Sequence, residues 1–373
     1  FKINEKSKKF KNKKTYVRVA FIKDYKFFWK ETKKDFNNSI NQGEVLAINK
    51  LIKTKSVFCK KLMWDDTGSI DNYEKIKKKY SKKNDHNILN KSNETIWFIN
   101  NLVIKFSSDK NFIKKRAKRS LLLKNFVPKL VNIEKNMYAY KYIEGNVFSK
   151  NLSLKKFKML LSFLKKFWKI NKLRNNIKFR SDCIKFYKDK TRLRIKMLHK
   201  RYKLNDTINT INNKKIPSIS TLFKKTDWQL LSNGISSRFH GDLHFENIIM
   251  NNDKKITLLD WRQEFEKNLV KGDLYYDLGK LMHGLIVDHN QVNANNFQIK
   301  INKNNVFLKI QRKKSHKICL KYFEKWLIEN NFDLIKVRII TALIFLNIAP
   351  LHHHPYSLFL YFLGKKMLAK NTQ

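Results

Sequence analysis

The order of hydrophobic and polar residues predicts two β-hairpins in the middle of the chain. Four short apolar runs form two pairs, 95–99 with 102–106 and 247–250 with 256–260. Asn100-Asn101 separates the first pair, and Asn251-Asn252-Asp253 separates the second. Such polar turns between apolar runs are typical of hairpins. A further run, 138–143, leads into Glu144-Gly145 and predicts a strand that ends in a turn.

Most later apolar positions recur at spacings of three and four residues, which predicts helices. One helix begins near Ser108 or Asp109 and ends before Pro128, and Ser153 caps another. Further helices are predicted over 186–202 and 218–231. The apolar run 339–351 is too short to span a bilayer, so we expect buried helices there and no transmembrane segment.

The first 80 residues have a different pattern. A predicted strand over 17–22 precedes helices over 25–35, 42–52 and 73–80, and the polar stretch 81–93 follows. That stretch is the best linker candidate, and it could also serve as the nucleotide loop. We therefore expect an α+β protein in four parts: a partial α/β segment (1–80), the linker or loop (81–93), a small β-rich lobe (94–147) and a helical lobe (148–373).

The composition is strongly basic. Lysine and arginine number 81 against 30 acidic residues, so the formal net charge is +51. This balance suggests nucleic acid or an anionic membrane surface as a partner. The bias of an AT-rich genome explains most of it, because Lys, Asn, Ile, Phe and Tyr are abundant while glycine stands at 9 and proline at 4. The basic residues form no single stripe. We therefore expect no specific nucleic-acid partner, and peripheral contact with an anionic membrane stays open.

The cysteines indicate a reducing compartment. Cys59, Cys183 and Cys319 are too few and too dispersed for a disulfide framework or a zinc site. There is no signal peptide, and the chain begins at Phe1 without an initiator Met. We therefore expect a cytoplasmic protein and a chain that is a fragment or a processed product.

Three polar residues in and before the second predicted hairpin point to phosphoryl transfer. Asp242 comes five residues before Asn247, and Asp260 ends the following strand. Carboxylate and amide oxygens suit magnesium, so Asn247 and Asp260 can hold the metal that bridges ATP phosphates while Asp242 accepts a hydroxyl proton. Each residue alone could equally cap a turn or end a strand. The ordered set, with the hairpin between its halves, favours one catalytic constellation.

These residues resemble the aminoglycoside phosphotransferase and choline kinase group, small-molecule relatives of protein kinases. The resemblance rests on His240-Gly241-Asp242, on Asn247, on Asp260-Trp261 and on the segment 272–278, which contains Asp273 and Asp277. It covers roughly residues 90 to 370 and implies a two-lobed fold with ATP and Mg²⁺ as cofactors. It also implies structural support of the site from His240, Asp273 and Asp277.

The resemblance assigns two further parts of a nucleotide site. Lys105, which emerges from a strand, would contact the ATP phosphates, and the backbone of Tyr142, Ile143 and Glu144 would form the adenine-binding hinge. The family's next helix usually supplies a glutamate that orients the lysine. Residues 110–125 contain no acid, so we expect Lys105 to pair elsewhere, with Asp260 the nearest motif residue able to serve.

The segment Trp64-Asp65-Asp66-Thr67-Gly68 resembles the closing segment of sugar-phosphate nucleotidyltransferases. The resemblance implies that Asp66 helps to hold a magnesium ion, in a site whose other parts would lie upstream of Phe1. The alternative is that Asp66 only caps the following turn.

Two classes of function follow. The first is an ATP- and Mg²⁺-dependent kinase of a small-molecule hydroxyl, with a sugar or an amino alcohol such as choline as acceptor. Its fusion to the nucleotidyltransferase-like segment suggests that the product is activated as a precursor for surface polysaccharide. The alternative within this class is an antibiotic-resistance enzyme whose acceptor is an aminoglycoside. The second is a catalytically degenerate, basic binding module. The His352-His353-His354 run could line the acceptor pocket, although a structural role is favoured.

Overall fold

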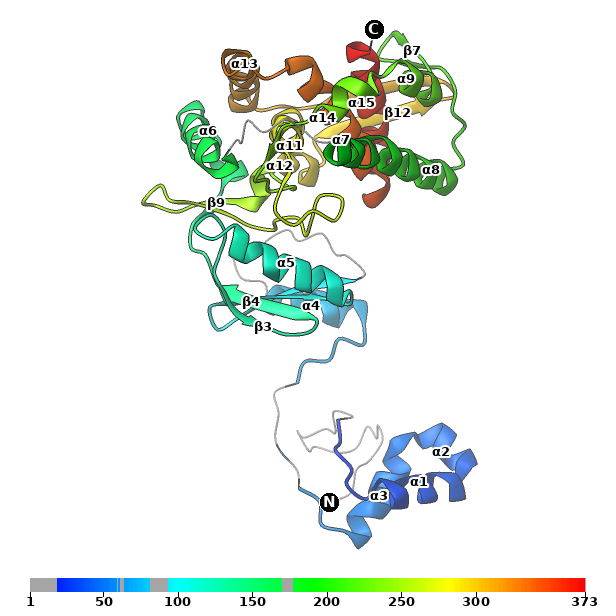
Figure 1. The fold of residues 1–373 in the computed structure, drawn as a ribbon. Helices are drawn as coiled ribbons and strands as arrows, with labels where there is room; N and C mark the ends of the chain where they lie inside the picture. The colour runs from blue at the N-terminus through cyan, green and yellow to red at the C-terminus, as the bar shows by residue number, and fades with distance from the viewer. Residues whose placement is uncertain (1–18, 59, 61–63, 81–92, 170–176, 373) are drawn as a thin grey trace. The chain divides into compact units, whose positions relative to one another are not determined.

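The computed structural model describes residues 19–58, 60, 64–80, 93–169 and 177–372 (Figure 1). The chain divides into two compact units, Phe1–Leu89 and Asn90–Gln373. The boundary between them falls inside the stretch 81–93 that the sequence marks as a linker, most of which lies outside the described residues.

Four helices make up the regular structure that is described in the first unit: α1 (Tyr25–Lys34), α2 (Phe36–Gln42), α3 (Glu44–Thr54) and α4 (Ile70–Tyr80). A small core forms where Phe28 meets Ala47, Ile48 and Leu51. The strand expected over 17–22 is wrong for residues 19–22, which form no strand, and residues 17 and 18 lie outside the described part. Phe21 is fully exposed, and a lone strand has neither a buried face nor a ladder partner to stabilise it.

The second unit begins with a small sheet. Its four antiparallel strands, in spatial order, are β1 (Glu94–Ile99), β2 (Leu102–Ser107), β4 (Met137–Lys141) and β3 (Leu130–Ile133). Asn100 and Asn101 both have positive φ, as a tight hairpin turn requires. Asp109 caps α5 (Lys110–Leu122), which lies along the sheet and packs on it with Ile113 and Ala117 (Figure 1).

The rest of the second unit is mainly helical. Its helices are α6 (Leu154–Trp168), α7 (Ile177–Ile184), the π-helical turn η2 (Lys185–Asp189), α8 (Lys190–Tyr202), α9 (Ile219–Lys225), α10 (Trp228–Ser232), α11 (Leu274–Ile286), α12 (His289–Asn293), α13 (Lys314–Glu329), α14 (Leu334–Ile348) and α15 (Tyr356–Asn371), with short 3-10 turns η1 (Phe148–Asn151), η3 (Phe245–Asn247) and η4 (Ala349–Leu351). A small β-rich lobe is thus followed by a large helical lobe, which confirms the expected two-lobed α+β fold.

Short strands shape the large lobe. The hairpin of β9 (Ile248–Met250) and β10 (Ile256–Leu258) is joined by β5 (Asn146–Val147), and β8 (Ser236–Ser237) pairs with β11 (Gly272–Asp273). A further sheet, which was not predicted from the sequence, has the order β12 (Phe297–Asn302), β13 (Asn305–Ile310), β6 (Asn209–Ile211) and β7 (Lys214–Ile216). Its signal was the alternation at 297–310 around a polar turn, where Lys303 has positive φ.

Helix α14 runs through the core of the large lobe. The segment Leu334–Leu351 is the one described helix long and apolar enough to cross a membrane, but 67% of it is buried inside the protein. Its close neighbours are α11 and α15. Burial within the lobe explains this apolar segment, as expected for the run at 339–351.

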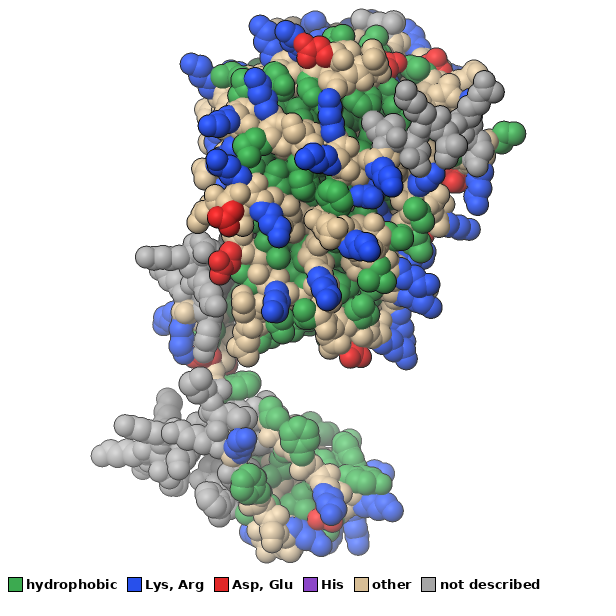
Figure 2. All heavy atoms as spheres, turned by 60° about the vertical axis from the view of Figure 1, so that its left-hand side comes forward, with side chains coloured by type: hydrophobic (Ala, Val, Ile, Leu, Met, Phe, Trp, Pro, Cys, Tyr) green, Lys and Arg blue, Asp and Glu red, His purple; other side chains and the backbone are tan. Residues whose placement is uncertain are grey.

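The cationic side chains are dispersed over the surface. On the face of the second unit in Figure 2, lysine and arginine side chains stand singly among apolar and neutral groups, and few acids are seen. Within the described part of that face they do not gather in one patch. A dispersed pattern agrees better with compositional bias than with a nucleic-acid stripe.

Candidate active site

Asp277 in the first turn of α11 holds the backbone of the loop that carries Asp242. The Asp277 carboxylate accepts hydrogen bonds from the backbone N–H groups of His240, at 2.7 Å, and Gly241, at 2.8 Å. The indole N–H of Trp168 donates to the same carboxylate at 3.1 Å. Burial raises the pKa of Asp277 to about 6, although these three hydrogen bonds favour the charged form. Asp277 therefore fixes where the loop turns.

The turn itself requires glycine. Gly241 has a φ of +83°, and a Cβ atom there would lie 2.6 Å from the Cβ of Arg262. His240 beside it is completely buried, and its Nδ1 accepts a hydrogen bond from the Asp242 backbone N–H at 3.2 Å. Burial lowers the pKa of His240 to about 3, so the ring is neutral and can serve as that acceptor. His240 thus shapes the loop from within.

Asp273 links α11 to the start of the loop. Its carboxylate caps α11 by accepting from the Tyr275 N–H and also accepts from the Ile235 N–H and the Tyr187 hydroxyl. The group is completely buried, and burial raises its pKa. Asp273 lies beneath the site and has no direct contact with Asp242 among these bonds.

Asp242 is held by neighbours on two sides. The ammonium of Lys280, on α11, lies 2.8 Å from Asp242 Oδ1. The amide nitrogen of Asn247 donates to the Asp242 backbone oxygen at 2.9 Å and lies 3.3 Å from Oδ2. Burial alone would raise the pKa of Asp242, but Lys280 and then His244 hold it well below its usual range. The side chain keeps 37% exposure, so an anionic oxygen remains accessible to an acceptor.

Asp260 receives two cations from the small lobe. The Lys105 ammonium on β2 and the Arg116 guanidinium on α5 each lie 2.5 Å from Asp260 Oδ1. Burial would raise the pKa of Asp260, but these two charges hold it well below the usual range. Asp260 also has a φ of +59°, a conformation that costs energy outside glycine and is concentrated at functional sites. The expected pairing of Lys105 with Asp260 is confirmed.

Arg116 is the residue through which α5 contacts Asp260. It lies on the buried face of α5 with Ile113 and Ala117, and its backbone oxygen accepts the Trp261 indole N–H at 3.0 Å. Arg116 falls at the helical spacing of the buried apolar residues, and this spacing could have indicated that it is buried. The signal is hard to recognise because the sequence contains so many basic residues. The helix therefore places a cation against Asp260 and supplies no glutamate to Lys105.

The side-chain oxygens of Asp260 and Asn247 are of the kind that suits a magnesium ion bound together with phosphates. The Leu259 N–H donates to the Asn247 backbone oxygen at 2.7 Å, which brings Asn247 and Asp260 to neighbouring strand ends. Both cations contact Oδ1 of Asp260, so Oδ2 would be the oxygen left for a metal, and Asn247 would add its carboxamide oxygen. Among the described residues no cluster of three His, Cys, Asp or Glu side chains could hold a metal without other ligands. Mg²⁺ commonly uses one or two protein oxygens and completes its shell with phosphate and water.

The predicted hinge lies between the lobes. Tyr142, Ile143 and Glu144 connect β4 to β5, and Gly145 follows them with a φ of +142°. A Cβ on Gly145 would meet the Met250 backbone oxygen at 2.8 Å, so glycine lets this connection approach β9 closely. The Tyr142 N–H already donates to the Asn101 backbone oxygen at 2.8 Å. A hinge contact to a base would therefore come from Ile143 or Glu144.

Asp66 belongs to the first unit. Its Oδ1 accepts a hydrogen bond from the Gly68 N–H at 2.9 Å, and Ser69 Oγ accepts from the Asn72 N–H at the start of α4. This geometry is that of a capped turn, the alternative that the sequence left open. Its predicted metal role stays a prediction.

Several residues near Asp242, namely Lys280, His283 and His289, were not predicted from the sequence. Lys280 is buried one helical turn after Asp277, so both residues face the loop from α11. Near it, the His289 ring lies 5.8 Å from that of His244 and 5.9 Å from that of His283. Burial, with nearby positive charge, lowers the pKa of His283 and of His289 and brings that of His352 to about 3. Only the His352 run had drawn attention in the sequence.

No protein-family model matches the chain, and no curated protein matches its sequence. Solved structures with a similar fold are small-molecule kinases. A ternary complex of streptomycin, ATP and APH(2")-IIa aligns at 16% identity and TM-score 0.44, covering 83% of this chain and 97% of that one. The choline kinase LicA from Streptococcus pneumoniae aligns at 15% and 0.42, covering 80% and 97%. Plasmodium vivax ethanolamine kinase aligns at 15% and 0.39, covering 84% and 95%. Similarity at this level describes the fold and assigns no family.

Proposed function

We propose that this protein is an ATP- and Mg²⁺-dependent phosphotransferase that acts on a hydroxyl group of a small molecule. The observation that carries the proposal is the convergence of Asp242, Asn247 and Asp260 with Lys105. These residues come from the loop 238–247, the β10 end and β2, and the Lys105–Asp260 contact of 2.5 Å joins the two lobes. A base, oxygen ligands and a lysine brought together in this way are the parts that phosphoryl transfer requires.

Each residue has one task in this mechanism. Lys105 binds the ATP phosphates, while Asn247 and Asp260 offer oxygen ligands to Mg²⁺. The bound metal would neutralise phosphate charge and hold the phosphates in line. Asp242 accepts a hydrogen bond from the acceptor hydroxyl and orients it for attack on the γ-phosphorus. Its low pKa keeps it ionised at neutral pH, so its main contributions are positioning and charge rather than strong basicity.

The groups around Asp242 favour a neutral acceptor such as a sugar. Asp242 itself is paired with Lys280, and the nearby Glu246 is paired with His244 at 2.9 Å. A cationic acceptor would meet the buried Lys280 ammonium and find neither acid free. The names of the similar structures include streptomycin, choline, ethanolamine and glucosamine. Of these chemistries, the sugar hydroxyl suits the local charge best, and an amino alcohol is the second choice.

The link to nucleotide activation is the further part of the proposal. A kinase product that is a sugar phosphate is the substrate type that a nucleotidyltransferase activates, and the segment 64–68 resembles that class. The product would be an activated precursor for surface polysaccharide. Incubation of the full-length protein with ATP, Mg²⁺, CTP or UTP and candidate sugars should then give a nucleotide-linked product.

The alternative is a degenerate binding module, and Arg116 is the observation that favours it. Helix α5 places Arg116 against Asp260, one of the two proposed metal ligands. This departs from the pattern of the kinase group that the sequence resembles. An assay with γ-labelled ATP, Mg²⁺ and a panel of sugars, polyols and amino alcohols separates the two. Transfer that is lost in Asp242→Asn, but kept in the matched variant Asp253→Asn on the exposed β9–β10 turn, supports the kinase. Binding without transfer to any acceptor supports the module.

A further inference from the structure

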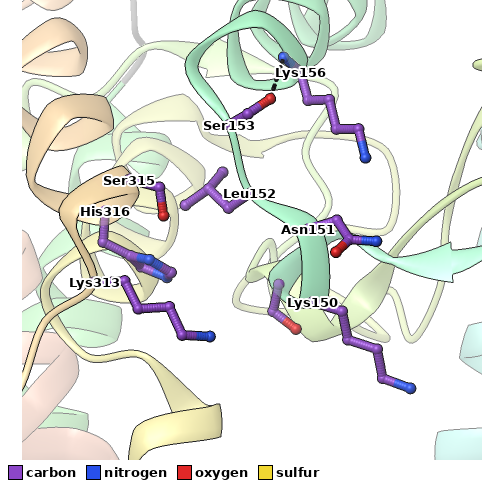
Figure 3. A pocket seen from close by; sticks show the side chains of 9 residues that line it. Lys150, Asn151, Leu152, Ser153, Lys156, Lys313, Ser315 and His316 are labelled. Carbon is purple, nitrogen blue, oxygen red and sulfur yellow. Dashed lines mark hydrogen bonds between the residues drawn. The ribbon is translucent and has the colours of Figure 1, made fainter.

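A cavity that none of Asp242, Asn247 and Asp260 lines lies where the N-termini of α6 and α13 approach each other. It has a volume of about 420 Å³. Its lining includes the lysines Lys150, Lys156 and Lys313 and the hydroxyl side chains of Ser149, Ser153 and Ser315, and it includes no acid. Figure 3 shows the α13 group on one side and the η1–α6 group on the other, with the cavity between them.

Both helix ends add positive potential to this cavity. Helix α6 has 15 residues and α13 has 16, long enough for their first turns to attract anions. The N-cap residue of α13 is Lys313, whose side chain makes no capping hydrogen bond. At α6 the Ser153 hydroxyl accepts from the Lys156 N–H at the long distance of 3.4 Å. The first turn of α13 therefore receives no side-chain acceptor from its N-cap residue, and its His316 N–H donates to the Lys313 backbone oxygen at 3.1 Å.

His316 supplies an independent sign of a missing ligand. It lines the cavity, is only 1% exposed, and neither ring nitrogen has a hydrogen-bond partner. Its Nε2 lies 3.8 Å from Asp288 Oδ2, which is beyond hydrogen-bonding distance. Buried polar groups without partners are uncommon and costly. Figure 3 shows the imidazole directed toward the space between the two walls.

Two acids, Asp288 and Glu246, lie close to His316 without lining the cavity. Asp288 is buried, and its Oδ2 lies 3.4 Å from the Lys313 ammonium. Its Oδ1 accepts from the Asn290 N–H at the start of α12. Asp288 offsets one lysine, and Glu246 is paired with His244, so two lysines, two helix ends and three hydroxyl groups remain for a ligand. That set matches a group with two negative charges and several acceptor oxygens.

We propose that this cavity is a binding site for a phosphate group, either inorganic phosphate or the phosphate of a small phosphomonoester. The three or four oxygens of a phosphate group can accept hydrogen bonds from both walls of the cavity at once, whereas a planar carboxylate has only two oxygens. The cavity adjoins the catalytic loop, because the His316 ring packs edge-to-face on Phe245, whose ring also contacts that of Phe148. The assignment does not depend on the proposed kinase activity.

The test compares two variants of equal charge. Lys150→Gln/Lys156→Gln removes two lining ammonium groups, and Lys155→Gln/Lys166→Gln removes two exposed ammonium groups of α6 that do not line the cavity. Phosphate and glycerol 3-phosphate are titrated by calorimetry at constant ionic strength. We expect binding by the wild-type protein, a loss of affinity of about tenfold or more in the first variant, and wild-type affinity in the second, since each charge-assisted contact contributes more than a neutral one.

His316→Asn provides the independent check, because it removes the ring while the lysines remain. This variant should bind phosphate and glycerol 3-phosphate more weakly. Its thermal stability without phosphate should stay close to that of the wild type. Binding of the ester alone identifies a phosphorylated metabolite, and binding of both identifies the phosphate group itself. Equal weakening in the two lysine variants, or no binding of either probe by the wild type, would overturn the assignment in favour of non-specific attraction to a basic protein.

Discussion

Lys105 and Asp260 form an ion pair of 2.5 Å although 155 positions separate them in the chain. The pair joins the second strand of the small lobe to the end of the β9–β10 hairpin. Arg116 adds a second cation to the same oxygen. Asp260 is therefore one point at which the two lobes meet, and two cations face its single negative charge.

Asp260→Asn should remove both metal binding and part of the fold's stability. Lys105 and Arg116 would stay buried without a negative partner, and breaking such a pair typically costs roughly 3–5 kcal/mol. Turnover should fall to background even at high Mg²⁺. Urea unfolding and a Mg²⁺ titration of activity measure the two effects. Asp253→Asn, in the exposed turn of the same hairpin, should change neither, and a stable Asp260→Asn protein with normal Mg²⁺ dependence would contradict the assignment.

Lys280→Met should shift the acid limb of the pH–rate profile to higher pH. Lys280 holds the pKa of Asp242 low, and the active form of Asp242 is the carboxylate. Without the lysine the pKa of Asp242 rises, so activity is lost at a higher pH as the solution is acidified. Lys280→Arg keeps the charge and should keep the profile. An unchanged acid limb in the Met variant would show that Lys280 does not act through Asp242.

Asp277→Asn should loosen the catalytic loop. An amide cannot accept from both the His240 and the Gly241 N–H groups through two oxygens, so one buried donor loses its partner at a cost of about 1–3 kcal/mol. We expect kcat to fall by about 10-fold to 100-fold, because a misplaced base affects the reaction more than nucleotide binding. The KM for ATP should change little. A large rise in that KM with normal kcat would place Asp277 in nucleotide binding instead.

Stability should fall as the pH drops from about 6.5 toward 3. Burial keeps the pKa of His352 and of His240 at about 3, below the ordinary value of 6.5, so the unfolded chain binds more protons in this interval. Asp277, with its pKa raised to about 6, acts in the opposite direction between about 4 and 6 and offsets part of the loss. Thermal unfolding at pH 7.5 and 5.0 measures the effect. His352→Gln should show a smaller loss on acidification, and an equal loss would contradict this cause.

The parts of the site that follow one another in the chain could be predicted from the sequence. Asp242, Asn247 and Asp260 lie within one loop and one hairpin, where local spacing limits the geometry. Arg116 and Lys280 could not be recognised, because each comes from a helix far away in sequence and resembles the many other basic residues. Their importance appears only when tertiary packing buries them against Asp260 and Asp242.

The fold shows the same division. The β1–β2 and β9–β10 hairpins and the helices α5 and α6 followed from turn chemistry, caps and periodicity. The β12–β13 hairpin is local, and its alternation was present in the sequence but was not recognised. Its parallel contact with β6 joins segments about a hundred residues apart, which local patterns do not encode. The strand predicted at 17–22 had β-forming residues but no partner strand among the described residues of its unit.

The most direct test of the proposed activity is transfer of the labelled γ-phosphate of ATP to a small-molecule hydroxyl. The wild-type protein with Mg²⁺ should form a stable phosphomonoester with at least one neutral sugar or polyol. Asp242→Asn should still bind ATP, but its rate of product formation should fall by a factor of about 10² or more, since general-base help is typically worth that factor. Product formation within a few-fold of the wild-type rate in Asp242→Asn, or transfer to no hydroxyl acceptor by the wild type, would contradict the account.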